Sequence, residues 1–378
     1  MNTIFIILAV LLMLASYGGM HYYLYRKLRW IFPRHKKFLI ISLSVLAVSL
    51  IVVQILSDNG LPLFLAPLAW LPAVWMGYVF LFFVIAGTAD LSLKGISLVH
   101  KNNVLLRIKQ ATRSIVTSGV TIMVCFAGYI SAQQINILSH TLTTPKLSQP
   151  VTIVQITDLH LGLLSSREHV EKLVASINAL QPDIIVSTGD LVDMQSEHLD
   201  GFSTTLAQLR ARLGKYAVYG NHEAYAGIDR SRGFTERSGF EVLSNQGVTL
   251  GQGIDIIGVD DPAVQGKIQP TGEEEKKLLE ESPPSLYTLL LKHQPVVSPE
   301  SLGRFDLQLS GHTHGGQIFP FTILVNLVYK APAGLSKAGP SSWLYVSNGT
   351  GTWGPPMRVL ARPEISVFYL QPETMGSK

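Results

Sequence analysis

Apolar positions divide the chain into two halves with different patterns. In the first 132 residues, apolar side chains run almost unbroken through four stretches. Each stretch is long enough to cross a bilayer, which takes about 20 residues in a helix. The stretches are residues 3–24, 38–57, 61–87 and 111–132. The pattern therefore predicts an α-helical membrane region with four transmembrane helices over residues 1–132.

Three of these stretches leave alternatives open. The first contains small residues around Ala15 and Gly18 that would suit a cleaved signal peptide, although its amino end lacks the usual positive charge. The third contains three prolines, so its helix can kink or begin later than residue 61. The fourth is the least hydrophobic, so the alternative for it is a helix that does not span.

The pattern changes after the fourth stretch. Residues 133–149 are polar and predict a linker. Beyond it, short β-branched runs end at turn residues, as buried strands do, at 151–157, 183–188, 215–219, 286–292 and 306–310. Between them, residues 167–180 and 202–213 show helical spacing of apolar positions. Alternation of strands and helices predicts an α/β domain over residues 150–378.

Later strand-like runs have no helical pattern between them. They cover residues 254–259, 343–347 and 365–370. Strands that follow one another without helices suggest a second sheet in the same domain.

Charge is distributed unevenly. The first 149 residues carry 12 Lys and Arg against two acidic residues, a net charge of +10, while the rest carries 18 against 24, or −6. The basic balance therefore comes from the loops of the membrane region, and we expect no nucleic-acid partner. The single cysteine, Cys125, rules out an intramolecular disulfide.

Loop charge predicts the orientation in the membrane. Residues 26–37 carry six Lys and Arg, and residues 89–110 carry four, whereas the link at 58–60 carries none. The positive-inside rule places both basic loops in the cytoplasm. We therefore expect a multi-pass protein of the cell membrane whose α/β domain is extracytoplasmic. The stretches hold almost no ionisable residues, which favours a passive anchor over a transporter with an appended enzyme.

Metal-binding side chains follow the predicted strands. The motifs are Asp158-Leu-His160, Gly189-Asp190, Gly220-Asn-His222, His293 and Gly311-His-Thr-His314. Carboxylate oxygen, amide oxygen and imidazole nitrogen are ligands of divalent metals. A single such residue is more often a cap, but five of the seven histidines after residue 150 lie in these motifs. Because strand ends converge in α/β sheets, the joint pattern predicts a metal centre.

The five motifs, in this order, resemble the calcineurin-like metallophosphoesterase superfamily over roughly residues 150–370. Residues 311–317 (GHTHGGQ), 345–351 (YVSNGTG) and 362–365 (RPEI) resemble its membrane-associated bacterial branch most. The resemblance implies a two-sheet β-sandwich flanked by helices, and a phosphoesterase that uses two divalent metal ions. Mn, Fe and Zn suit these ligands equally.

The resemblance also implies a role for each residue. One metal would be held by Asp158, His160, Asp190 and His314. The other would be held by Asp190, Asn221, His293 and His312, so that Asp190 bridges the two ions. In such centres two cations about 3.5–4 Å apart activate a water as hydroxide. His222 would stabilise or protonate the leaving oxygen.

Two acidic residues beside the motifs have less certain roles. Asp193 could hydrogen-bond a ligand from outside or cap the following helix. Glu223 could support a ligand or face the substrate. We do not expect either to bind metal directly.

Together these features predict a membrane-anchored phosphoesterase that hydrolyses a phosphodiester, a pyrophosphate or a phosphomonoester. Anchoring confines the site to the bilayer surface, so we expect a lipid-linked or envelope-precursor phosphate as the substrate. The alternative is a non-catalytic sensor that binds a phosphorylated ligand. A sensor would be expected to lack a ligand or His222, and none is missing.

Residues 318–328 (IFPFTILVNLV) form an apolar run directly after the last histidine motif. The run is too short to span a bilayer. It fits either a buried core element or an exposed segment at the rim of the site that contacts lipid. In the second case Phe319, Phe321, Ile323 and Leu324 would matter for lipid substrates.

The predicted orientation can be tested with topology reporters. A reporter inserted near Arg34 should give the cytoplasmic signal, and one fused after Lys378 the extracytoplasmic signal. Equal signals from the two fusions would show that the number of spans is wrong. A cytoplasmic carboxyl end would point to nucleotides and other soluble phosphates.

Overall fold

The computed structural model describes residues 3–58, 67–100, 104–193, 199–267 and 272–373. The chain divides into two compact units. One comprises Met1–Ile130 with Gly354–Met357, and the other Ser131–Trp353 with Arg358–Lys378.

The first unit is helical. Its helices are α1 (Thr3–Leu28), α2 (Lys36–Asp58), α3 (Pro67–Val99) and α4 (Gln110–Gln133), with a short 3-10 turn at Val104–Arg107. Helices α1, α2 and α3 pack on one another around a small apolar core. That core consists of Leu24, Leu39, Leu43, Val79, Phe82 and Ala86.

Within the part of the chain that the structure describes, three helices are long and apolar enough to cross a membrane. They are Lys36–Leu56, Pro67–Val99 and Gln110–Gln133, and they correspond to the second, third and fourth predicted stretches. The start of the third predicted stretch lies outside the described residues. Helix α1 covers the first predicted stretch but is not among the three, so a four-span region stays a prediction.

Three polar contacts join α1 to α3 inside this apolar unit. The Lys27 ammonium lies 2.6 Å from the Asp90 carboxylate, which also accepts a 2.6 Å hydrogen bond from the Tyr23 hydroxyl. The Trp75 indole donates to His21 at 2.9 Å. A charge among apolar helices needs a partner, because an unpaired ion pays the full cost of desolvation. These pairs therefore fix which faces of α1 and α3 meet.

The second unit contains two six-stranded sheets. The first has the order β1 (Asn136–Thr144), β12 (Glu364–Pro372), β2 (Val151–Ile156), β3 (Ile184–Ser187), β4 (Gly214–Ala217) and β5 (Glu241–Val242). The second has the order β10 (Gly334–Lys337), β11 (Trp343–Val346), β9 (Leu307–Ser310), β8 (Tyr287–Lys292), β7 (Ile254–Val259) and β6 (Gln246–Leu250). Strands β2 to β5 run parallel, and so do β7, β8, β9 and β11.

The central strands are buried on both faces. Every residue of β3, β7, β8 and β9 is buried. The sheets pack face to face through an apolar layer that includes Ile153, Val186, Ile256 and Leu289. A strand covered on both sides reads as a continuous apolar run. This explains the β-branched runs of the sequence.

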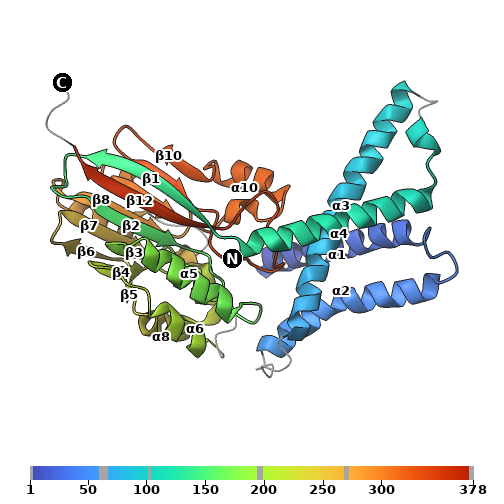
Figure 1. Ribbon diagram of the computed structural model, residues 1–378, viewed down its shortest axis with the longest axis horizontal. Coiled ribbons are helices and arrows are strands. Elements are labelled where there is room, and N and C mark those ends of the chain that lie inside the picture. Colours follow the sequence, from blue (N-terminus) through green and yellow to red (C-terminus); the bar gives the residue numbers. More distant parts are fainter. Residues whose placement is uncertain (1–2, 59–66, 101–103, 194–198, 268–271, 374–378) are drawn as a thin grey trace. The chain divides into compact units, whose positions relative to one another are not determined.

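Helices cover the outer faces of the two sheets. Helices α5 (Arg167–Ala179), α6 (Asp200–Leu206) and α8 (Ile228–Arg237) lie on the first sheet (Figure 1). Helix α9 (Glu273–Glu281) packs on the second through Leu279. Two short helices lie at metal-binding motifs: α7 (Asn221–Ala226) begins within the motif of residues 220–222, and α10 (Phe321–Tyr329) follows the last histidine motif. The result is the predicted α/β sandwich of two sheets flanked by helices.

Three sequence expectations differ from the structure. The predicted linker at 133–149 contains β1, which pairs in parallel with β12 along nine residues. Its exposed positions explain why it looked like a linker. Strand β12 was expected in the second sheet, but it lies in the first, antiparallel to β2. Helix α6 ends at Leu206 and not at 213, because the chain turns there to enter β4, where the Leu213 amide bonds to Asp183.

Candidate metal centre

The metal-binding motifs lie directly after five parallel strands. Strands β2, β3 and β4 of one sheet lead into Asp158, Asp190 and Asn221, and β8 and β9 of the other lead into His293 and His312. Backbone contacts join the two sets of loops. The His312 amide donates to the Asp158 carboxylate at 3.0 Å, and His293 Nδ1 lies 2.8 Å from the Thr188 carbonyl oxygen. The two sheets therefore bring their strand ends to one place.

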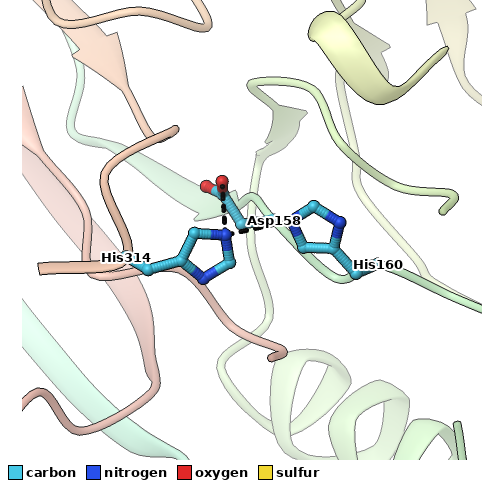
Figure 2. A group of neighbouring side chains, drawn as sticks. All are labelled: Asp158, His160 and His314. Atoms are coloured by element: carbon cyan, nitrogen blue, oxygen red, sulfur yellow. Dashed lines mark hydrogen bonds and ion pairs between the residues drawn. The ribbon is translucent and has the colours of Figure 1, made fainter. Parts of the chain in front are cut away.

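Asp158, His160 and His314 form the first group of ligand atoms. His314 Nε2 lies 3.3 Å from Asp158 Oδ1 and 2.9 Å from His160 Nε2. In Figure 2, dashed lines join the His314 ring to the Asp158 carboxylate and to the His160 ring. All three residues are buried, and their ligand atoms lie within 4.8 Å of one another. This spacing suits a single cation bound at their centre.

Asp190, His293 and His312 form the second group. His293 Nε2 lies 3.1 Å from Asp190 Oδ2 and 3.0 Å from His312 Nδ1. The same Asp190 oxygen lies 3.7 Å from His160 Nε2 of the first group. One carboxylate oxygen therefore stands between the two groups, as a bridging ligand would.

Several polar atoms of the predicted ligands have no hydrogen-bond partner or face another atom of the same kind. Asn221 Oδ1 is buried and has no hydrogen-bond partner. The ring nitrogens of His160 and His314 face each other, and so do those of His293 and His312. Lone pairs that face each other repel unless a proton or a cation lies between them. The residues present therefore fit bound cations.

His222 belongs to neither of these two groups. Its Nδ1 lies 2.9 Å from the Asp193 carboxylate, and this pair forms a third cluster with His160. The rings of Tyr225 and Trp353 stand edge-on to His222, with centroids 5.5 and 5.8 Å away. The structure therefore shows Asp193 in contact with His222.

Glu223 is buried, and its carboxylate contacts the backbone of the ligand loops. Its carboxylate accepts hydrogen bonds from the amides of Asp190 at 2.9 Å, Leu191 at 2.7 Å and Val192 at 3.3 Å. It also accepts one from Gly220 at 2.7 Å. One side chain thus ties the loop after β3 to the loop after β4.

The loops that carry the ligands are strained. Five of the seven predicted ligands adopt left-handed backbone conformations, which side-chain-bearing residues rarely do. They are Asp158 (φ 54°), His160 (46°), Asp190 (53°), His312 (71°) and His314 (51°). Such strain persists only where the surroundings hold it, and it concentrates at functional sites.

Two glycines of the motifs are needed for space. A Cβ at Gly311 would overlap the Asp158 carboxylate, and one at Gly220 would overlap that of Asp190. Neither glycine is left-handed. The loops therefore pack their backbone directly against the predicted ligands.

Comparison with known proteins decides the family. Residues 151–316 match the calcineurin-like phosphoesterase domain. An uncharacterized metallophosphoesterase of Aquifex aeolicus is 36% identical over 236 residues, which are 61% of this chain and 90% of the relative. The chain belongs to the calcineurin-like phosphoesterase family. Its domain is that of a metal-dependent phosphoric ester hydrolase.

Other relatives of this phosphoesterase are longer than the region they share with it. An uncharacterized metallophosphoesterase of Helicobacter pylori is 39% identical over 61% of this chain and 62% of its own length. A transmembrane protein with a metallophosphoesterase domain from Bos taurus is 34% identical over 70% of this chain and 63% of its own length. Together with the three apolar helices, such relatives support membrane association of this phosphoesterase.

Burial favours the neutral form of two predicted ligands of the phosphoesterase, His160 and His312. It lowers the pKa of His160 to about 4 and that of His312 to about 3. A neutral imidazole is the form that binds a metal. Burial alone would also lower the pKa of His222, but the hydrogen bond to Asp193 and the charge of Asp190 raise it above its usual value.

Sequence reasoning missed two residues that touch the predicted ligands. The Tyr329 hydroxyl at the end of α10 lies 2.6 Å from His312 Nε2. Arg358 is fully buried and donates to the carbonyl oxygens of His314 at 2.8 Å and Asn348 at 2.7 Å. The only sequence signal for Arg358 is a charge within an otherwise apolar run, residues 357–361.

The later motifs of the sequence build the loop that Arg358 holds. Glu364 of the RPEI motif accepts hydrogen bonds from Tyr345 at 2.6 Å and Asn348 at 2.9 Å. Within the same loop, the Gly351 amide donates to the Asp158 carbonyl oxygen at 3.0 Å. The YVSNGTG and RPEI motifs therefore support the loop that carries Asp158.

Replacing Glu223 should weaken the fold and the metal centre together. Glu223→Ala leaves four backbone amides without their acceptor, and each unsatisfied buried donor costs about 1–3 kcal/mol. We expect the free energy of unfolding to fall by about 3 kcal/mol or more, with a lower metal content. Denaturation of the full chain and elemental analysis would measure both. Glu236→Ala, on the exposed side of α8, is the control and should change stability by less than about 0.5 kcal/mol.

Proposed function

We propose that this protein is a membrane-anchored phosphoesterase that works with two divalent metal ions, Mn, Fe or Zn. Asp158, His160, Asp190 and His314 would hold one ion, and Asp190, Asn221, His293 and His312 the other. The position of Asp190 Oδ2, 3.1 Å from His293 Nε2 and 3.7 Å from His160 Nε2, is the observation that carries this proposal. Every predicted ligand is present, which argues against a sensor without activity.

The ligand loops are held in place before any substrate binds. When bound, two divalent cations would supply a water nucleophile and offset charge on the phosphoryl oxygens. The chain contributes the positions of the ligand side chains, through Glu223, which holds the loops after β3 and β4, and Arg358, which holds the His314 backbone. Such preorganisation avoids reorganisation cost during the reaction.

His222 is the residue we assign to the leaving group. Asp193 engages its Nδ1, so Nε2 is the nitrogen that can donate a proton to the departing oxygen. The exposed rings of Tyr225 and Trp353 flank this imidazole. They would restrict how the leaving group approaches it.

The substrate we propose is a phosphodiester, a pyrophosphate or a phosphomonoester of a lipid or an envelope precursor. Three helices able to cross a membrane support a multi-pass anchor. Loop charge supports an extracytoplasmic position of the domain. A site confined to a bilayer surface meets lipid-linked phosphates at high local concentration.

Asp190→Asn tests the bridging role. The amide cannot carry the negative charge that two cations share, so metal content and turnover of a chromogenic phosphodiester should fall together. Elemental analysis and initial rates of the purified full chain measure both. Asp200→Asn, at an exposed surface pair with Arg237, is the control. Two metals per chain with near-normal turnover in Asp190→Asn would disprove a dinuclear centre bridged by this residue.

His222→Ala should separate chemistry from metal binding. The variant should keep its metals, while turnover falls roughly 10²–10⁴-fold because the proton donor is lost. The loss should be smallest for esters with acidic leaving groups, which depart without a proton. His169→Ala, outside the motifs, serves as the control. An equal loss for all leaving groups would show that His222 is not the acid.

A further inference from the structure

Helix α10 exposes an apolar surface beside the metal centre. None of the nine residues of α10 is buried, and its sequence is FTILVNLVY. Leu324, Leu327 and Val328 are 54%, 68% and 71% exposed, and Phe319 just before the helix is 39% exposed. The alternative expectation, that this segment is a buried core element, is therefore wrong for α10. Soluble domains rarely expose contiguous apolar patches of this kind unless something binds there.

Both ends of α10 are fixed to the histidine motif. Near its start, the Thr322 hydroxyl donates to the Gly315 carbonyl oxygen at 2.9 Å. At its end, the Tyr329 hydroxyl contacts His312 Nε2 at 2.6 Å. The exposed apolar surface therefore keeps a constant position relative to the predicted metal ligands.

A pocket of about 680 Å³ lies between the end of α10 and the second sheet. Apolar side chains dominate its lining, among them Val296, Val297, Val328, Ala331 and Leu344. Pockets of 300–1,000 Å³ with such linings bind small apolar ligands. The volume is sufficient for a hydrocarbon chain.

Two residues of the pocket lining are next to predicted metal ligands. Gln294, the residue after the ligand His293, lines it together with Tyr329, which contacts His312. Two lysines, Lys330 and Lys337, also line it. An apolar pocket that carries ammonium groups and adjoins a phosphate-binding centre matches a molecule with a hydrocarbon chain and an anionic head.

The membrane region of the chain indicates which apolar molecule can reach this pocket. Three of its helices can cross a membrane, and the last of them, α4, ends at Gln133. Strand β1 begins at Asn136, so two residues join the last candidate span to the phosphoesterase domain. A domain tethered this closely stays at the lipid surface, where membrane lipid is the most abundant apolar ligand.

We propose that α10 lies in the lipid interface and that the pocket behind it receives a hydrocarbon chain of a lipid phosphate. The phosphate of that lipid would lie at the metal centre. This inference rests on the proposed phosphoesterase function and names its substrate class. The lysines would contact the anionic head group, while α10 contacts the surrounding acyl chains.

A homologous series of substrates tests the pocket. The full chain, in nanodiscs of phosphatidylcholine and loaded with metal, is given 4-nitrophenyl alkyl phosphodiesters from methyl to decyl. The leaving group is constant, so changes in kcat/KM report contacts of the alkyl chain. We expect kcat/KM to rise at least about tenfold from methyl to decyl, because each buried methylene contributes favourably.

Variants assign the effect to named side chains. Val296→Ser with Val328→Ser should lower the decyl-to-methyl ratio of kcat/KM about tenfold. Leu324→Ser with Leu327→Ser should lower kcat/KM for the decyl ester more than for the methyl ester. Leu138→Ser is the matched control, since Leu138 is 41% exposed on β1 of the other sheet. All changed side chains are at least partly exposed, and melting temperatures would verify that the variants fold.

Photolabelling adds a readout that does not need turnover. An alkyl phosphonate with a diazirine near its chain end is irradiated with the full chain in nanodiscs, and labelled peptides are identified by mass spectrometry. Labels within residues 294–297 and 328–344 are expected. Labelling confined to other segments would overturn the proposal.

Failure of this inference differs from failure of the proposed function. A rate independent of chain length, with good hydrolysis of the methyl ester, overturns the lipid pocket and keeps the phosphoesterase. No hydrolysis of any ester by the metal-loaded protein overturns the proposed function. In that case the labelled positions still decide whether the pocket binds a hydrocarbon chain.

Discussion

Three carboxylates buried at the meeting of two sheets set the main constraint on this structure. Asp158, Asp190 and Glu223 are each at most 2% exposed. A buried carboxylate costs several kcal/mol unless hydrogen bonds or cations compensate it. Glu223 is compensated by four backbone amides. Asp158 and Asp190 each accept a hydrogen bond from one backbone amide and also face an imidazole nitrogen, of His314 and His293, an arrangement that suits divalent cations.

This constraint explains the irregular backbone around the centre. Left-handed residues and closely packed glycines let the loops turn their side chains inward within four residues of a strand end. Such loops cost free energy, so they need support from outside. Arg358 and Glu364 provide it by holding the loop of residues 345–351 against the first ligand motif.

The same centre is linked to an apolar surface. His312 contacts Tyr329, and Tyr329 ends a helix with no buried residue. Exposed leucines of α10 thus lie near a cluster of buried charge, and these two environments favour opposite solvents. A phosphate attached to a hydrocarbon chain satisfies both at once. A lipid ligand would therefore account for the juxtaposition.

The sequence by itself determined the residue types of the centre, their order, and their place after buried strands, because strand periodicity and turn residues are local properties. It also determined three of the apolar helices and the two-sheet class. Only the tertiary structure decided that β1 extends the first sheet, that Glu223 faces backbone amides, and that Arg358 and Tyr329 touch ligands. These facts depend on contacts between distant residues, such as His160 and His314, 154 positions apart. Strand pairing brings such residues together, and no local pattern encodes it.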